Sequence, residues 1–135
     1  MGAPEFLAVG HLSRDLSSEG YRPGGAAAYG TLTARKMGLS AAVVTSGGPD
    51  LADVTSGLGI PIHVVPSAET TTFDNTYSAG RRRQVLKSVA GPIRPSDVPD
   101  DWRSAGLVLL GPLAGEVDYE LAGHFPDSLV VASIQ

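Results

Sequence analysis

The chain has 135 residues, the size of one domain, and its 42% hydrophobic and 18% charged residues exclude an intrinsically disordered protein. The formal net charge of −4 argues against nucleic acid as the main partner, because binding to phosphates needs a basic surface. The absence of cysteine excludes disulfide scaffolds and thiolate metal sites, and no apolar run approaches the ~20 residues of a membrane helix, so we expect a cytoplasmic protein without a membrane partner.

The first half of the sequence alternates short apolar strands with helices. A buried strand is predicted at 5–11, and an alanine-rich helix follows Gly24-Gly25 and ends at Gly38. A second strand at 41–45, a short helix at 51–58 and a third strand at 62–65 come next. This alternation predicts an α/β fold, in which a mostly parallel sheet is flanked by helices.

Residues 69–89 break this rhythm and predict a β-hairpin. The segment TTTFDNTY is rich in β-forming residues, Ser78-Ala79-Gly80 supplies a turn, and RRRQVLKSV returns. We expect one face of the hairpin to be exposed to solvent. The arginines near the turn are most simply a solvated hairpin tip, because alternation sends neighbouring side chains to opposite faces.

The remaining residues return to the α/β pattern. A proline-rich loop follows the hairpin, and then come a short helix at 100–104, a strand at 107–111, a helix at 116–125 and a strand at 129–134. Because the sequence stops directly after an apolar strand, we expect residues 1–135 to be the N-terminal part of a longer domain.

The loops that follow the first strand hold the most informative polar residues. Asp15 comes shortly after the strand, and Gly24-Gly25 leads into a helix N-terminus. In open α/β sheets ligands bind outside the carboxyl ends of the strands, where a carboxylate can accept hydrogen bonds from ligand hydroxyls and glycines let backbone amides approach. The alternative interpretation is that Asp15 caps a turn and the two glycines only close it.

Other candidate residues have equally simple structural explanations. Glu116 follows a strand and could reach the same crevice as a substrate contact, but a first-turn acid of a helix is the simpler interpretation. The histidines are scattered without the spacing of metal ligands, so no metal site is predicted. Trp102 is expected to anchor a short helix.

Several motifs, taken in order, resemble the ribokinase-like (PfkB) carbohydrate kinases. These are G-x4-D at 10–15, the diglycine before a helix, GGPD at 47–50, the hairpin TTTFDNTYSAGRRRQVL and the later GPLAGE. The run from ETTTFDNTY to GPIRPSDVP looks most like the branch that contains myo-inositol kinases. This resemblance covers nearly the whole chain. It implies a mostly parallel sheet between helices with a small β lid, here as the N-terminal, substrate-side half.

The resemblance also implies roles for single residues. Asp15 matches the acid that binds substrate hydroxyls, and Gly24 and Gly25 match the diglycine that lines the substrate pocket. Tyr29 stands where the family usually has an asparagine that contacts substrate. Only eight residues separate Asp15 from Gly24, so lid strands there must be short or absent, and the hairpin that begins near Phe73 is expected to cover the pocket.

The catalytic half of such a kinase is missing from the sequence. Neither the GAGD-type motif, which holds the catalytic base and the anion-stabilising loop, nor a Walker A sequence is present, so catalytic residues are expected beyond Gln135. The resemblance implies that the full-length protein uses ATP and Mg²⁺ to phosphorylate a small polyol, namely a sugar, cyclitol or nucleoside. The segment alone is expected to be inactive and to bind neither.

Two alternatives stay open on the sequence. The chain can be a non-catalytic polyol-binding or interaction module, in which case its last strand needs a partner chain, and a homo-oligomer is one way to provide it. A generic nucleotide-binding α/β domain is the weaker alternative, because no G-x-G-x-x-G follows a strand.

Overall fold

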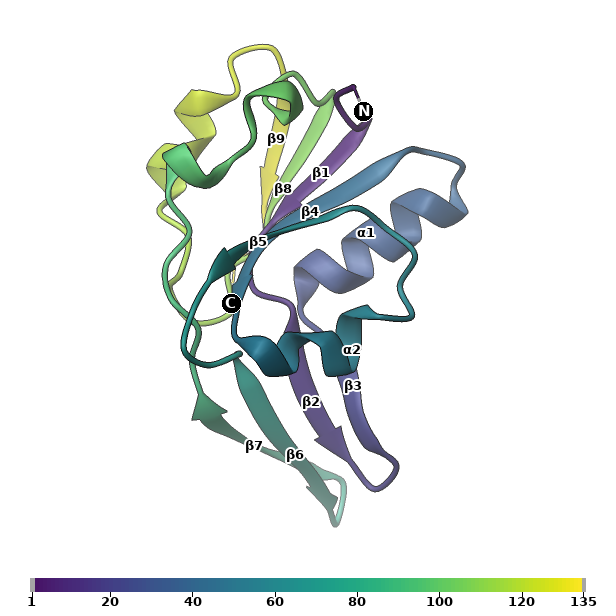
Figure 1. The fold of residues 1–135 in the computed structure, drawn as a ribbon. Helices are drawn as coiled ribbons and strands as arrows, with labels where there is room; N and C mark the ends of the chain where they lie inside the picture. Colours follow the sequence, from purple (N-terminus) through teal and green to yellow (C-terminus); the bar gives the residue numbers. More distant parts are fainter. Residues whose placement is uncertain (1, 135) are drawn as a thin grey trace.

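The computed structural model describes residues 2–134, which form two β-sheets, helices and loops (Figure 1). The larger sheet has five parallel strands in the order β5-β4-β1-β8-β9. Its strands are β1 (Phe6–Val9), β4 (Ala41–Gly47), β5 (Ile62–Pro66), β8 (Leu107–Leu110) and β9 (Leu129–Ala132). The expected parallel sheet is therefore confirmed, with strand limits that differ from the predicted ones by only a few residues.

Helices cover both faces of this sheet. On one face lie α1 (Ala26–Lys36), the 3-10 turn η1 (Pro49–Leu51) and α2 (Ala52–Thr55), and their apolar residues pack on Ala8 and Val43. The other face is covered by loops and the 3-10 turns η2 (Pro95–Asp97), η3 (Asp100–Trp102) and η4 (Tyr119–His124), which pack on Leu7 and Val9. Successive side chains of β1 thus pack in two separate apolar clusters on opposite faces of the sheet, as the alternation of side chains along a strand requires.

The helix α1 ends where the sequence predicts it. The backbone N–H of Gly38 donates to Arg35 and that of Leu39 donates to Ala34, so the last carbonyls of the helix are satisfied. Gly38 has a φ of +90°, a left-handed conformation that favours glycine.

The prediction of a helix at 116–125 is wrong. Only Tyr119–His124 is helical, as the 3-10 turn η4, and the Asp118 side chain caps it by accepting from the Glu120 N–H. Gly115 has a φ of +75°, which turns the chain before any helix can begin there. Glu116 lies before this turn and is therefore not an acid in the first turn of a helix.

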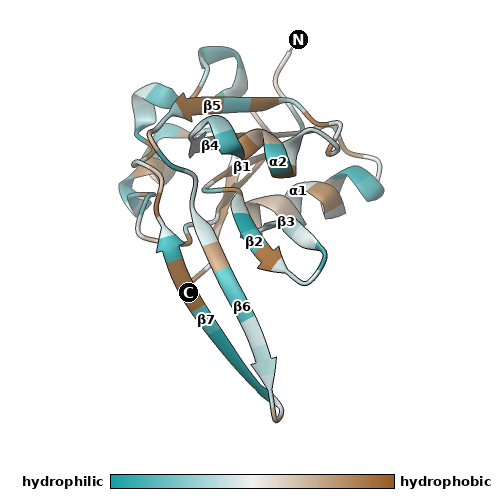
Figure 2. Cartoon of the chain, turned by 60° about the horizontal axis from the view of Figure 1, so that its bottom comes forward, coloured by the Kyte–Doolittle hydropathy of each residue, from teal (hydrophilic) through white to brown (hydrophobic). Residues whose placement is uncertain are grey.

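The smaller sheet has four strands in the order β3-β2-β6-β7 and extends from the carboxyl edge of the larger one (Figure 1). Its strands are β2 (Ser13–Ser17), β3 (Gly20–Gly24), β6 (Thr72–Ser78) and β7 (Arg81–Ser88). We call it the lid sheet. Figure 2 shows β6 and β7 reaching out from the body as a long hairpin with mixed polar and apolar residues.

The lid sheet agrees with the predicted hairpin and adds a second one. The hairpin at 69–89 is present as β6 and β7, while β2 and β3 fold residues 13–24 into a short hairpin, the segment for which the sequence left open short strands or none. The two hairpins join through a parallel pairing in which Asp15 lies opposite Phe73. The lid is therefore made by both hairpins together.

The outer strand β9 exposes apolar side chains, with Leu129 at 65% and Val131 at 44% of their full accessibility. Trp102, the last residue of η3, packs on the core cluster, as expected of an anchor. Within the described residues, no helix combines the length and the apolar character needed to cross a bilayer.

Candidate functional site

A pocket of about 490 Å³ lies against one face of the lid sheet. Its size falls in the range of roughly 300–1,000 Å³ that is usual for small-molecule sites. It is lined by Ser13, Asp15, Gly25, Ala26, Tyr29, Phe73, Asn75, Tyr77, Arg82, Gln84 and Leu113. These residues come from β2, β6, β7, the start of α1 and the loop after β8, so the pocket depends on segments far apart in the sequence.

Strand register decides which side chains of the lid sheet reach the pocket. In β6 every second residue lines it, namely Phe73, Asn75 and Tyr77, while Asp15 lies opposite Phe73 on β2. Gln84 pairs with Asn75 and Arg82 pairs with Tyr77 across the hairpin. Because side chains alternate between the two faces of a strand, the intervening residues point away from the pocket.

Asp15 is held by its own strand. The Ser13 hydroxyl donates a hydrogen bond of 2.7 Å to Oδ1 of the half-buried Asp15 carboxylate. Gly24 stands opposite Ser13 on β3, and a Cβ at this position would overlap the carboxylate of Asp15. Gly24 therefore does not line the pocket, but its missing side chain leaves the space that the Asp15 carboxylate occupies.

Gly25 brings the start of α1 against the pocket. Its φ is +96°, and a Cβ there would lie 2.8 Å from Cδ1 of Leu113 and 3.0 Å from the carbonyl oxygen of His11. No other residue type fits this space without displacing a neighbour. The N-terminal end of a helix carries partial positive charge, so this approach favours electron-rich groups in the pocket.

We expect Gly25→Ala to destabilise the protein more than Gly38→Ala. Both glycines have positive φ, but nothing lies near a Cβ at Gly38. The left-handed strain alone should lower the free energy of unfolding by about 1–2 kcal/mol in Gly38→Ala. Overlap with Leu113 and His11 should raise the loss to about 2–5 kcal/mol in Gly25→Ala. Urea denaturation measures both values, and equal losses would contradict the close packing at Gly25.

The other predicted residues are divided between the pocket and its surroundings. Tyr29 lies in the first turn of α1 at the edge of the pocket and is 65% exposed, while Phe73 is half-buried in its wall. Asp15, Gly25, Tyr29 and Phe73 thus share one pocket, and Gly24 lies beside it. Glu116 does not line this pocket.

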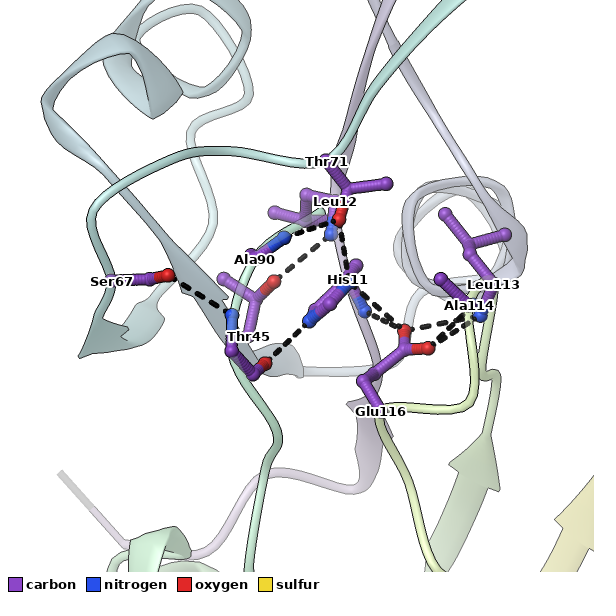
Figure 3. A network of polar contacts seen from close by, with 10 residues as sticks. His11, Leu12, Thr45, Ser67, Thr71, Ala90, Leu113, Ala114 and Glu116 are labelled. Atoms are coloured by element: carbon purple, nitrogen blue, oxygen red, sulfur yellow. Dashed lines mark hydrogen bonds and ion pairs between the residues drawn. The ribbon is translucent and has the colours of Figure 1, made fainter. Parts of the chain in front are cut away.

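Glu116 is buried between two loops, and its carboxylate accepts hydrogen bonds from the backbone (Figure 3). The donors are the N–H groups of His11 at 2.7 Å, Leu113 at 2.8 Å and Ala114 at 2.8 Å. These contacts fix the loop after β1 to the loop after β8. The carboxylate is therefore occupied by backbone N–H groups next to the pocket, and its role in this structure is to hold these two loops together.

The buried imidazole of His11 extends the network to the lid (Figure 3). Its Nε2 lies 2.8 Å from the Gly91 carbonyl, which can only accept, so Nε2 donates. Its Nδ1 lies 2.7 Å from Oγ1 of Thr71, which accepts from the Ala90 N–H and can donate to the ring. Thr71 precedes β6, and Ala90 and Gly91 follow β7, so both roots of this hairpin are held at His11.

The outer face of the lid sheet is fastened separately. Arg14 donates to Asp50 at 2.9 Å and to Asp53 at 3.0 Å, which joins β2 to the η1–α2 segment. Its guanidinium also lies 3.8 Å from the ring centre of Tyr21 on β3. Arg14 itself is largely buried, with 12% of its side chain exposed, whereas both acids stay partly open to solvent, so these contacts mainly fix the position of the arginine.

Among residues 2–134, no group of three or more His, Asp or Glu side chains is placed to hold a metal ion. His11, His63 and His124 lie on different segments, and His63 packs edge-on against Trp102 at a centroid distance of 6.4 Å.

Some pocket residues were not identified from the sequence. Ser13 was not singled out because the sequence left open whether residues 13–24 form short strands or none. Asn75, Arg82 and Gln84 lie in the predicted hairpin, and the alternation of TTTFDNTY already places Asn75 on the same face as Phe73, but not which face lines a pocket.

Comparison with solved structures establishes the fold. A pyrophosphate-dependent kinase in the ribokinase family, complexed with a pyrophosphate analogue and myo-inositol, matches 94% of this chain with a TM-score of 0.72 and 23% identity, over 48% of its own length. An uncharacterised sugar kinase from Pyrococcus horikoshii matches 78% of this chain with a TM-score of 0.64 and 18% identity, over 44% of its own length.

A possible 1-phosphofructokinase from Thermotoga maritima matches 94% of this chain with a TM-score of 0.63 and 12% identity, over 53% of its own length. The chain thus has the ribokinase-like fold and spans about half the length of these structures. No family model matches the sequence, and no curated protein sequence matches it at a significant level.

Proposed function

We propose that this chain is the N-terminal, substrate-side half of a ribokinase-like kinase that phosphorylates a hydroxyl group of a small polyol. The observation that carries the proposal is the position of Asp15, a half-buried acid in the wall of a pocket under the lid sheet. The similar structures support it, because one was solved with myo-inositol and another is described as a sugar kinase.

The pocket residues suit the binding of neutral polyols. A carboxylate accepts hydrogen bonds and cannot donate when ionised, so Asp15 pairs with the donor groups of hydroxyls. Phe73 and Leu113 supply apolar surface for the carbon face of a ring. The lid sheet shields a bound polyol from water on one side, and fixed orientation of the reacting hydroxyl is the main help that this half can give to phosphoryl transfer.

The phosphoryl donor is assigned to the remainder of the kinase. ATP and Mg²⁺ are the donor and ion proposed for the full-length protein, as the ATP complex of one similar sugar kinase suggests. Similar structures include kinases described as pyrophosphate-dependent and one in complex with ATP, so both donors belong in the test. The absence of cysteine fits the reducing cytosol, which is the location we propose.

The test is a phosphorylation screen of the complete protein. ATP or pyrophosphate is offered with Mg²⁺ and one polyol at a time, taken from cyclitols, hexoses, pentoses and nucleosides, and phosphorylated product is followed by ³¹P NMR. We expect transfer to one polyol class. Polyol binding by calorimetry without any transfer would favour the non-catalytic binding module, and absence of both binding and transfer would contradict the proposal.

A further inference from the structure

His11 carries a buried imidazole that the proposed reaction does not use. Its side chain is completely shielded from solvent and does not line the pocket, so it does not touch a bound polyol. Nε2 donates to the Gly91 carbonyl at 2.8 Å, and Nδ1 accepts from the Thr71 hydroxyl at 2.7 Å. One neutral tautomer, with its proton on Nε2, satisfies both partners, because imidazole offers a donor and an acceptor at two places on one rigid ring.

These two partners lie at the two roots of the β6–β7 hairpin. Thr71 directly precedes β6, and Gly91 comes shortly after β7. The strand β7 is exposed along nearly its whole length, so the outer part of the hairpin has little packing against the body to hold it. The direction of the hairpin is therefore decided near its roots and at its short pairing with β2. The imidazole ties both roots to the loop that leads from β1 into β2 (Figure 3).

The backbone of His11 contacts the other walls of the pocket. Its N–H donates to the Glu116 carboxylate at 2.7 Å, and the same carboxylate accepts from the N–H of Leu113, which lines the pocket. Its carbonyl oxygen lies against the start of α1, 3.0 Å from the place of a Cβ at Gly25. The lid hairpin, the loop after β8 and the start of α1 therefore meet at one residue, whose side chain fixes the first of them relative to the other two.

We infer that His11 is a positioning residue, which holds the β6–β7 hairpin at the angle where its inner face closes over the polyol. This inference rests on the proposed function and extends it to the control of the lid. Without the imidazole the hairpin swings away from the pocket, so the polyol is held less well and water enters the site. Water then attacks the phosphoryl group in place of the polyol hydroxyl. The bond to the leaving group of the donor breaks, a proton of the water passes to solvent, and inorganic phosphate forms instead of polyol phosphate.

The experiment compares the complete wild-type protein with His11→Ala, using the donor and the polyol found in the screen. We expect His11→Ala to raise KM for the polyol roughly tenfold and to change kcat far less, because losing the buried hydrogen bonds lowers the population of the closed lid. It should also release more inorganic phosphate for each polyol phosphorylated. Hydrogen exchange followed by mass spectrometry should be faster in β6 and β7 of the variant, which reports on the lid without any need for activity.

Matched variants separate this role from a general loss of stability. Leu121→Ala shortens a buried side chain of η4 that does not line the pocket, so it should lower Tm by a comparable amount and leave KM and the exchange of the lid near their wild-type values. His11→Gln keeps an N–H donor near the place of Nε2 and should recover part of the affinity. If His11→Ala does not fold, Thr71→Val replaces it, because it removes the hydroxyl that donates to Nδ1 and keeps the shape of the side chain.

The outcomes that overturn this role are distinct from those that overturn the function. Transfer by the wild type together with unchanged KM, phosphate release and lid exchange in His11→Ala overturns the role of His11 and leaves the proposed function standing. The same holds if Leu121→Ala raises KM as much as His11→Ala does, since the effect then follows stability alone. A wild-type protein that binds no polyol and transfers no phosphate overturns both.

Discussion

Replacing Asp15 with alanine is expected to lower kcat/KM for the polyol by at least roughly 100-fold in the complete protein. Each hydrogen bond between a hydroxyl and an ionised carboxylate contributes about 1.5–3 kcal/mol, and a carboxylate can accept two from neighbouring hydroxyls. Ser13 holds one oxygen of the acid in place, so the group is oriented before the ligand arrives. Steady-state kinetics with the polyol found in the screen measures the effect.

Two variants make this result specific. Asp74→Ala removes an acid of comparable burial from the adjacent strand, where register places it on the opposite face of the lid sheet, and should leave kcat/KM near the wild-type value. Asp15→Asn keeps an acceptor oxygen without the charge and should fall between the wild type and Asp15→Ala. Unchanged kinetics in Asp15→Ala would remove Asp15 from the substrate site.

Glu116→Ala is expected to lower the free energy of unfolding by about 3 kcal/mol or more, because three backbone N–H groups lose their acceptor in a buried place. For a domain of this size such a loss corresponds to a fall in Tm of roughly 10 °C. Thermal denaturation followed by circular dichroism measures it. Glu120→Ala, at an exposed site in η4, is the matched control and should leave Tm nearly unchanged.

The same variant separates two roles for Glu116. If the carboxylate only holds the loops and the lid root, Glu116→Ala loses stability and polyol affinity together, and Glu116→Gln, which keeps one acceptor oxygen, loses less of each. A variant with normal stability and lost affinity would instead show that Glu116 contacts the polyol directly, the role that its position after a strand first suggested.

Local sequence patterns were enough to predict the larger sheet. Its strands are short apolar runs separated by helix-forming segments and turns, and such runs carry their own signal. The prediction of a helix at 116–125 was wrong because hydrogen bonds to residues outside the segment decide its conformation. Glu116 is used by backbone groups distant in sequence, and the positive φ of Gly115 redirects the chain.

The lid sheet and the pocket show the limit of sequence reasoning. Residues 13–24 are polar and rich in turn formers, and they become strands because β2 finds a partner in β6. That pairing joins distant segments and has no local signature. Asp15 and Gly25 could be proposed as ligand contacts from the loop pattern, and alternation puts Phe73 and Asn75 on one face of the hairpin. That this face lies against the same pocket as Asp15 required the structure.

The junction between β2 and β6 also bears on how the chain folds. Arg14 and Thr72, which pair there, are 58 residues apart in sequence, whereas each hairpin closes over a short turn. Bringing distant segments together costs chain entropy, and the larger sheet lowers this cost because it holds β1 beside β4 and so places the roots of the two hairpins close together. Strand β7 is exposed along nearly its whole length whereas β4 is buried throughout, so we expect the lid sheet to open at a lower free energy than the larger sheet, and native-state hydrogen exchange measures this difference.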